Sequence, residues 1–506
     1  MPLKVGIVFN YLQLPDVAQY PFVINKRTDD IVIKKGIFVY THSIEGFLIG
    51  IVEKIVLLNE YFSDALTIKA YNNNNNPNIL KGLFPSDDFE YAIAIVRNLG
   101  IIEFKKGSAD TIERTSRMTY PASPGKEVFL VEKDTLIDFI GLDKQKGLNL
   151  GRFNSIDIEA TINMDRLLNK HFSILSISGG GKSYLTSIII EELLNRNHSF
   201  GTPAIILIDV HGEYTYLKGI NKIKEKVKLI DMSYFQVSVP QMSPYLFRKY
   251  QDQISHVQIR ELTKVIKQLR DKSESKAHYG IKDIIKSIEN VSDGSKSTKQ
   301  ALIGWLSELD RLTIFGPQEN PNLNNIVNQG ELVIFNLESE TSIRKKQILV
   351  DYICNRLFYL RRIQKIPPFL LIIEEAHQFC PEAAHSKALS KNIIETIARE
   401  GRKFMACLCL ISQRPKKLST TALSQTNSKL ILNIKNPYDL KHLMDSSEAI
   451  TKEYTDMISS LGVGEMLLMG NAVNYPVFIK VRERKFKSER ETISLSSICM
   501  NWNVKN

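Results

Sequence analysis

Residues 1 to about 140 alternate between short apolar runs and turn-rich polar segments. Short runs rich in β-branched and aromatic residues predict strands. The predicted strands are Lys4–Phe9, Ile31–Tyr40, Phe47–Leu58, Leu66–Tyr71 and Glu127–Val131. We also expect one helix near Asp87–Leu99 and a solvated loop tip at the asparagine run Asn72–Asn76. This pattern indicates a small β-barrel or sandwich domain over residues 1–145.

From residue 146 onward, apolar runs alternate with segments of helical periodicity. The runs are uninterrupted, as expected of parallel strands buried on both faces. They are Phe172–Leu175, Ala204–Asp209, Leu332–Asn336, Phe369–Ile373, Ala406–Ile411 and Leu430–Ile434. We therefore expect an α/β core with a parallel-rich sheet, made of residues 146–244 and 313–484 and ending in a hairpin over 466–469 and 477–482. Residues 245–312 are charged and helical (258–269, 281–288 and 299–312), which predicts a helical insertion, and residues 485–506 form a basic tail.

The composition is that of a globular protein, with 43% hydrophobic and 24% charged residues in 506. No apolar stretch approaches the length of a membrane span, and the start lacks an apolar leader. Five scattered cysteines fit a reducing compartment, so we expect a cytoplasmic protein. The net charge of +11 favours an acidic partner, of which nucleic acid is the commonest for a nucleotide-driven protein.

A glycine-rich loop, residues 176–183, joins the apolar run 172–175 to the helical pattern 184–194. This arrangement predicts a nucleoside triphosphate site, because backbone N–H groups and a helix N-terminus bind phosphate. Lys182 would reach the β- and γ-phosphates of ATP, and Ser183 would bind Mg²⁺. The expected nucleotide-binding residues are Ser178, Gly179, Gly180, Gly181, Lys182, Ser183 and Tyr184. The usual loop opens with glycine, whereas this one opens with Ser176.

Acidic residues follow two of the predicted strands. Glu374 and Glu375 come directly after Phe369–Ile373, at a carboxyl end where ligands of open α/β sheets bind. We assign Glu374 to the Mg²⁺ side and Glu375 to the positioning or deprotonation of the attacking water. Aspartate is usual at the first of these positions. Asp209 is expected near the phosphates if its strand neighbours the strand 172–175 that precedes the glycine loop. For His211, a structural role is the favoured interpretation.

A polar amide and a basic cluster complete the candidate chemistry. Gln413 follows the predicted strand Ala406–Ile411, where an amide can sense the γ-phosphate. Arg399 and Arg402, with Lys403, lie just before that strand. These bases are either a solvated helix end or an arginine finger that reaches a neighbouring subunit, and the sequence leaves both interpretations open.

In order along the chain, these motifs resemble those of the HerA family of hexameric DNA-translocating ATPases, within the HerA/FtsK class. The narrowest matches are Asp209–Tyr214, Arg399–Lys403 and Ser412–Pro415, and the resemblance covers about residues 120–482. It implies a RecA-like P-loop core, a homo-hexameric ring with ATP between subunits, and Arg399 or Arg402 acting in trans. It also implies duplex DNA in the pore and a NurA-like nuclease on the N-terminal barrels. Candidate DNA-contacting lysines are Lys387, Lys391, Lys416 and Lys417.

The leading functional hypothesis is an ATP-driven, sequence-nonspecific double-stranded DNA translocase or helicase that works with a nuclease in DNA end processing. The alternative is an ATP-binding ring that serves as an assembly platform for a nuclease or sirtuin-like effector in antiviral defence. Ser176 and Glu374 lend some support to the platform, because a weakened site suffices for assembly. A conjugation or viral packaging ATPase is a third hypothesis, and the small N-terminal barrel argues against conjugation.

Overall fold

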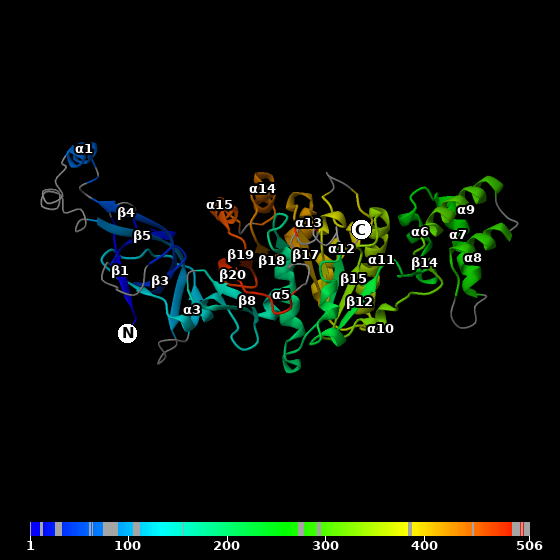
Figure 1. Ribbon diagram of the computed structural model, residues 1–506, viewed down its shortest axis with the longest axis horizontal. Helices are drawn as coiled ribbons and strands as arrows, with labels where there is room; N and C mark the ends of the chain where they lie inside the picture. The colour runs from blue at the N-terminus through cyan, green and yellow to red at the C-terminus, as the bar shows by residue number, and fades with distance from the viewer. Residues whose placement is uncertain are drawn as a thin grey trace. The chain divides into compact units, whose positions relative to one another are not determined.

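The computed structural model describes residues 2–10, 14–25, 33–59, 62, 64–73, 90–104, 112–154, 156–271, 278–290, 295–382, 387–447, 450–487, 496 and 499. The chain divides into two compact units (Figure 1). The first comprises Met1–Gly147, Gly151–Ile162 and Val473–Lys480. The second comprises Leu148–Leu150, Asn163–Ala472 and Val481–Asn506.

Six antiparallel strands of the first unit close into a barrel. Their order is β2-β1-β7-β3-β4-β5, and β5 pairs back to β2, which closes the sheet. The strands are β1 (Lys4–Val8), β2 (Gln19–Ile24), β3 (Phe38–Ser43), β4 (Gly46–Asn59), β5 (Glu90–Phe104) and β7 (Glu127–Leu130), with β6 (Ile112–Ser116) added beside β5. The predicted N-terminal β-barrel is confirmed. A helix, α3 (Lys133–Ile140), follows it.

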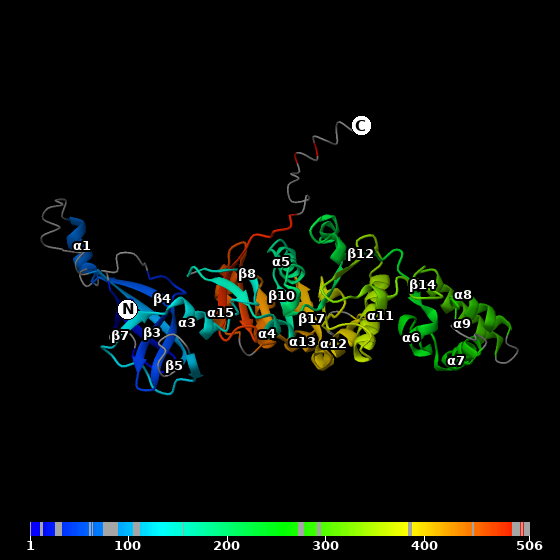
Figure 2. The ribbon, with the colours of Figure 1, turned by 90° about the horizontal axis from the view of Figure 1, so that it is seen from below.

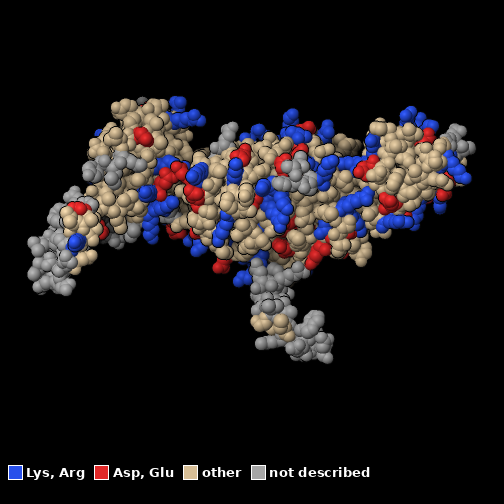
Figure 3. Space-filling model, turned by 90° about the horizontal axis from the view of Figure 1, so that it is seen from above, with Lys and Arg blue, Asp and Glu red and all other residues tan. Residues whose placement is uncertain are grey.

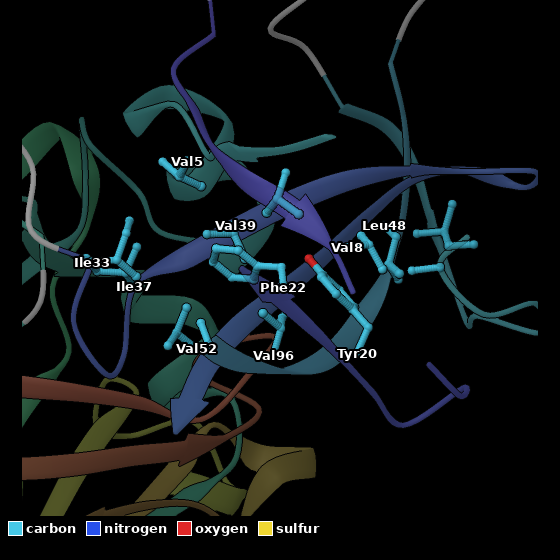
Figure 4. Packing of buried hydrophobic residues seen from close by; sticks show 14 residues of the cluster. Val5, Val8, Tyr20, Phe22, Ile33, Ile37, Val39, Leu48, Val52 and Val96 are labelled. Carbon is cyan, nitrogen blue, oxygen red and sulfur yellow. The ribbon is translucent and has the colours of Figure 1, made fainter. Parts of the chain in front are cut away.

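Alternate side chains of the barrel strands fill its interior, as the period of a half-buried strand requires (Figure 4). Tyr20, Phe22 and Leu48 are among the fully buried side chains. Gly50 is needed where β4 and β5 approach closely, because a Cβ there would lie 2.4 Å from Val96 Cγ1. The register of the β4–β5 pair shifts beside this glycine.

Three predictions in this unit were wrong. Residues 66–71 lie in a helix, α1 (Ala65–Asn73), on which Leu66 is exposed, so the apolar alternation there marked no buried strand face. The predicted helix at 87–99 is strand β5 from Glu90 onward, because pairing with β4 and β2 overrides the helical preference of its alanines. Strand β3 begins at Phe38, seven residues later than predicted. Residues 74–76 of the asparagine run lie outside the described residues.

A parallel sheet forms the centre of the second unit. Its order is β12-β15-β11-β16-β17-β10-β18, with β19 antiparallel at the end of this series. The strands are β10 (His171–Leu175), β11 (Ala204–Asp209), β12 (Val227–Asp231), β15 (Leu332–Asn336), β16 (Phe369–Ile373), β17 (Ala406–Ser412), β18 (Thr426–Ile431) and β19 (Glu465–Gly470). The predicted α/β core is confirmed, although β18 begins four residues earlier than expected. Short strands elsewhere are β8 (Leu148–Phe153), β9 (Glu159–Ile162), β13 (Val237–Ser238), β14 (Phe315–Gly316) and β20 (Val477–Val481).

Helices lie on both sides of this sheet, with α5 on one side of β10 and α12 and α13 on the other (Figure 2). The helices of the sheet region are α4 (Met164–Leu168), α5 (Lys182–Leu194), α10 (Leu323–Ile326), α11 (Ile343–Arg362), α12 (Lys391–Glu400), α13 (Thr420–Gln425), α14 (Pro437–Asp445) and α15 (Lys452–Ser460). The predicted insertion contains α6 (Pro244–Tyr250), α7 (His256–Asp271), α8 (Ile281–Asn290) and α9 (Lys296–Asp310). None of the helices that the structure describes is long and apolar enough to cross a membrane.

Candidate nucleotide-binding and hydrolysis site

The glycine loop joins β10 to α5. Gly179 and Gly181 have φ values of +72° and +94°, in the left-handed region that L side chains rarely adopt, so both positions require glycine. Gly181 is the N-cap of α5, and Lys182 is the first helical residue. The loop therefore leads directly into a helix N-terminus, where backbone N–H groups bind anions.

Ser176, the departure from the usual loop, lies buried beneath it. Its Oγ donates to the Ile177 carbonyl oxygen at 3.1 Å. A Cβ at Gly180 would lie 1.9 Å from this Oγ, so the serine occupies the space that any other residue at 180 would need. Ser176 is absent from the lining of the adjacent pocket and does not obstruct it.

The loop opens into a pocket of about 570 Å³. The pocket collects residues from the loop and α5, from the turn after β11, and from the ends of β16 and β17. Its lining residues are Ser178, Gly179, Gly181, Lys182, Ser183, Tyr184, His211, Glu213, Glu374, Glu375 and Gln413. Nine of these were predicted from the sequence. Gly180, Asp209, Arg399 and Arg402 were also predicted but do not line it.

Lys182 is only 9% exposed. Its Nζ donates to the Ile177 carbonyl oxygen at 3.0 Å, within the glycine loop. Burial lowers the pKa of Lys182, and the carboxylates of Glu375, Glu213 and Glu374 oppose that shift. The amine is thus held at the floor of the pocket beside the acidic groups, in a position to neutralise further negative charge.

Strand β17 lies between β10 and β16, so the acid pair follows a strand that is not adjacent to the P-loop strand. Asp209 is farther away, because β11 lies beyond β16. The strand adjacency on which the expectation for Asp209 rested is therefore absent. Asp209 instead accepts backbone N–H groups from Glu213 at 3.1 Å and Tyr214 at 3.0 Å, and so shapes the turn after β11.

Glu374 is buried, and its Oε2 accepts the Val210 N–H at 3.1 Å. It also shares a side-chain hydrogen bond with Asp209. Burial raises the pKa of Glu374, and the nearby charges of Asp209 and Glu213 raise it further. The glutamate side chain is longer than the aspartate that is usual at this position, and it reaches the turn after β11 while still lining the pocket.

Glu375 has a left-handed backbone, with φ +47° and ψ +43°. Such a conformation is strained for a residue with a Cβ and is often found at functional sites. Its carboxylate is buried and hydrogen-bonded to Gln413. Burial raises the pKa of Glu375, while the charges of Lys182 and His211 lower it. A raised pKa increases the basicity of this carboxylate, which suits proton abstraction.

His377 is a neutral neighbour of Glu375. Burial, followed by the positive charges of Arg414, Lys417 and Lys182, lowers its pKa to about 4. Its Nδ1 lies 3.2 Å from Glu375 Oε2 and 3.2 Å from Ser412 Oγ. The histidine therefore joins the end of β16 to the end of β17 without adding charge.

Two oxygen donors in the pocket fit the expected Mg²⁺. Ser183 at the start of α5 and Glu374 at the end of β16 line the same space. Across the described part of the chain, no group of three or more His, Cys, Asp or Glu side chains forms a metal cluster. That donor set suits Mg²⁺, which keeps waters and substrate phosphate oxygens among its ligands.

The two predicted finger arginines are exposed and lie outside the pocket lining. Arg399 Nη1 lies 3.9 Å from Glu395 Oε2, one turn away on α12. Arg402 lies in the short helical turn after α12. Neither arginine lines the pocket of this chain.

Sequence reasoning missed Glu213 and assigned His211 a structural role, although both side chains line the pocket. The signal was present, since both residues follow strand β11 within the motif Asp209–Tyr214. The tight turn that aims them into the pocket depends on Gly212, with φ +70°, and on the Asp209 cap. Only the folded turn shows this direction.

The chain is similar to known proteins over most of its length. The family described as "Helicase HerA, central domain" matches residues 148–357. A probable helicase of Methanocaldococcus jannaschii is 26% identical over 96% of this chain and 97% of its own length. A "Probable DNA double-strand break repair helicase HerA" of the same organism is 28% identical over 78% of this chain and 86% of its own length. The solved structure of VirB4 from Thermoanaerobacter pseudethanolicus has a TM-score of 0.53 at 13% identity, covers 69% of this chain and 99% of its own, and shows a shared fold alone. The family match covers about two fifths of the chain, and together with relatives that are 26–28% identical over most of the chain it supports a HerA-type ATPase.

Proposed function

We propose that this protein is an ATP-driven, sequence-nonspecific translocase or helicase of double-stranded DNA, that it forms a hexameric ring, and that it works with a nuclease in DNA end processing. The observation that carries the proposal is the convergence of Lys182, Glu374, Glu375 and Gln413 on one pocket at the glycine loop. The names of the HerA relatives, which are repair helicases, support the DNA substrate.

In the proposed hydrolysis reaction, the loop N–H groups bind the phosphates of ATP. Lys182 leaves its hydrogen bond to Ile177 and contacts the β- and γ-phosphates. Glu375 accepts a proton from the attacking water, and Gln413, hydrogen-bonded to Glu375, senses the γ-phosphate. Ser183 and Glu374 would hold Mg²⁺, which when bound would supply positive charge to neutralise the phosphates.

The arginine positions support an assembly in which the site is completed by a second subunit. Arg399 and Arg402 are exposed and outside their own pocket, as a finger acting in trans requires. An arginine that contacts the γ-phosphate stabilises the charge of the transition state. The neighbouring subunit of the proposed ring would supply this contact.

The charge distribution supports a sequence-nonspecific DNA contact. The net charge is +11, and Lys and Arg side chains are spread over the face in Figure 3 among scattered acids. Of the candidate lysines, Lys391 lies 3.8 Å from Glu395, and Lys416 lies over the Tyr438 ring. Lys387 and Lys417 are exposed, and they are our first choices for phosphate contacts.

The test is ATP hydrolysis by the purified protein with and without linear duplex DNA. We expect DNA to stimulate turnover, and we expect Lys182→Ala and Glu375→Gln to abolish it. Glu375→Gln should still bind nucleotide, because the substitution keeps the size of the side chain. Equal turnover with and without DNA would refute the motor and favour the platform for a nuclease or sirtuin-like effector. Ring formation and effector function that persist in Lys182→Ala would point the same way.

A further inference from the structure

A buried carboxylate fastens the segment after β20 to helix α5. We call residues 482–487 the C-terminal strap. Glu191 is fully buried, and its Oε2 accepts both Arg482 Nη1 and Nη2 at 3.1 Å. It also accepts the backbone N–H groups of Lys485 at 3.0 Å and Phe486 at 2.7 Å. A carboxylate is costly to bury, and this set of charged and backbone donors compensates its lost hydration.

The strap carries Arg484 to the first turn of α5. The guanidinium carbon lies 5.1 Å from the centre of the Tyr184 ring and 5.3 Å from that of Tyr216. The Arg484 backbone N–H donates to the Tyr184 hydroxyl at 2.9 Å. Arg484 is only 8% exposed, and a cation–π contact is stronger when water is excluded.

These contacts occupy one face of α5. Tyr184, Ser187 and Glu191 are three and then four residues apart, a spacing that places them above one another on a helix. The Tyr216 hydroxyl donates to Ser187 Oγ at 3.1 Å. Ser187 lies on α5 between Tyr184 and Glu191, the two residues that the strap contacts. Figures 1 and 2 both show the red C-terminal segment passing beside α5.

Tyr184 links this face to the chemistry, because it follows Lys182 and Ser183 directly and lines the same pocket. We propose that Arg484 is a positioning residue for nucleoside triphosphate binding. It acts by holding in place the Tyr184 ring, which lines the pocket. The inference rests on the proposed ATPase function. It makes nucleotide affinity depend on a residue that lies 300 positions after Tyr184 in the sequence.

The experiment measures binding of a fluorescent ATP analogue with Mg²⁺ to the full-length protein, and KM and kcat for ATP. Arg484→Ala should weaken binding about tenfold, as expected for loss of a desolvated cation–π contact. KM should rise by a similar factor while kcat stays within about twofold, because the hydrolytic residues are unchanged. Arg484→Lys should restore part of the affinity. Lys485→Ala is the matched control, since its side chain reaches only Glu192, and it should bind like the wild type.

A double-mutant cycle separates positioning from general damage to the strap. Tyr184→Leu should weaken binding as Arg484→Ala does, and the double variant should be no weaker than either single one. Additive losses would overturn the inference, as would an Arg484→Ala affinity equal to that of Lys485→Ala. A lowered kcat at unchanged KM would also overturn it. Failure of the wild type to bind the analogue would instead overturn the proposed function.

Discussion

The left-handed backbone of Glu375 makes a prediction about stability that is separate from catalysis. Glu375 has φ +47° and ψ +43°, is 5% exposed, and accepts the Gln378 N–H at its carbonyl oxygen at 2.8 Å. An L residue in this conformation costs about 1–2 kcal/mol, because its Cβ approaches the following carbonyl oxygen. Glycine avoids that contact.

Comparing Glu375→Ala with Glu375→Gly isolates the backbone contribution. Both substitutions remove the carboxylate, so they differ only by the Cβ. Glycine removes the cost of about 1–2 kcal/mol but loses about 0.5–1 kcal/mol through the greater freedom of its unfolded chain. The glycine variant should therefore be more stable by roughly 0.5–1 kcal/mol. In a unit of this size that corresponds to about 1–2 °C in melting temperature.

Differential scanning calorimetry measures this difference. The second compact unit contains the nucleotide site, so its unfolding transition in the wild type is the transition that MgATP moves to higher temperature. Matched substitutions at Glu400, an exposed position with φ −114° and ψ −18°, should give the reverse order, because alanine is favoured in that region. A Glu375→Gly variant that melts at or below Glu375→Ala would refute the reasoning.

Three further predictions concern the site and the strap. Because burial raises the pKa of Glu375 and the base must be ionised, kcat should fall as the pH is lowered through that raised pKa, and a flat pH–rate profile would contradict this role. Gly180→Ala should weaken binding of the fluorescent nucleotide, and Ser176→Gly in the same chain should restore much of it, since the closest contact of the added Cβ is the Ser176 Oγ at 1.9 Å. Glu191→Ala should destabilise the unit that contains α5 by about 2–4 kcal/mol and expose the C-terminal strap to proteolysis, because two backbone N–H groups lose their acceptor and Arg482 keeps only Glu192 as a carboxylate partner. Glu192→Ala should have a smaller effect, and equal effects would contradict this explanation.

The α/β core was predictable because its strands are continuous apolar runs that end at chemically distinctive residues. β11, β15 and β16 have the bounds expected from the pattern, and the glycine loop was identified together with its helix. The barrel region was harder. Leu66 and Ile68 alternate as strand residues do, yet both are exposed on α1. The alanines of β5 favour a helix locally, and the decisive factor is hydrogen bonding to strands distant in sequence.

The site shows the same division. Lys182, Glu374, Glu375 and Gln413 were identified because each follows a strand at a recognisable motif, and local sequence is enough to specify that chemistry. The order of the strands is a property of long-range pairing that a linear pattern does not contain. It places β17 between β10 and β16, and it moves Asp209 away from the P-loop strand.

The sequence by itself therefore determined which groups are present: the phosphate loop, the acid pair and the amide that follows a strand. Only the tertiary structure decided how they meet. The glycine turn places His211 and Glu213 in the pocket lining. Ser176 lies beneath the loop and outside the pocket lining, and Arg484 lies over the Tyr184 ring. The physical reason is that motif chemistry depends on neighbours in sequence, whereas burial, pairing and side-chain direction depend on neighbours in space.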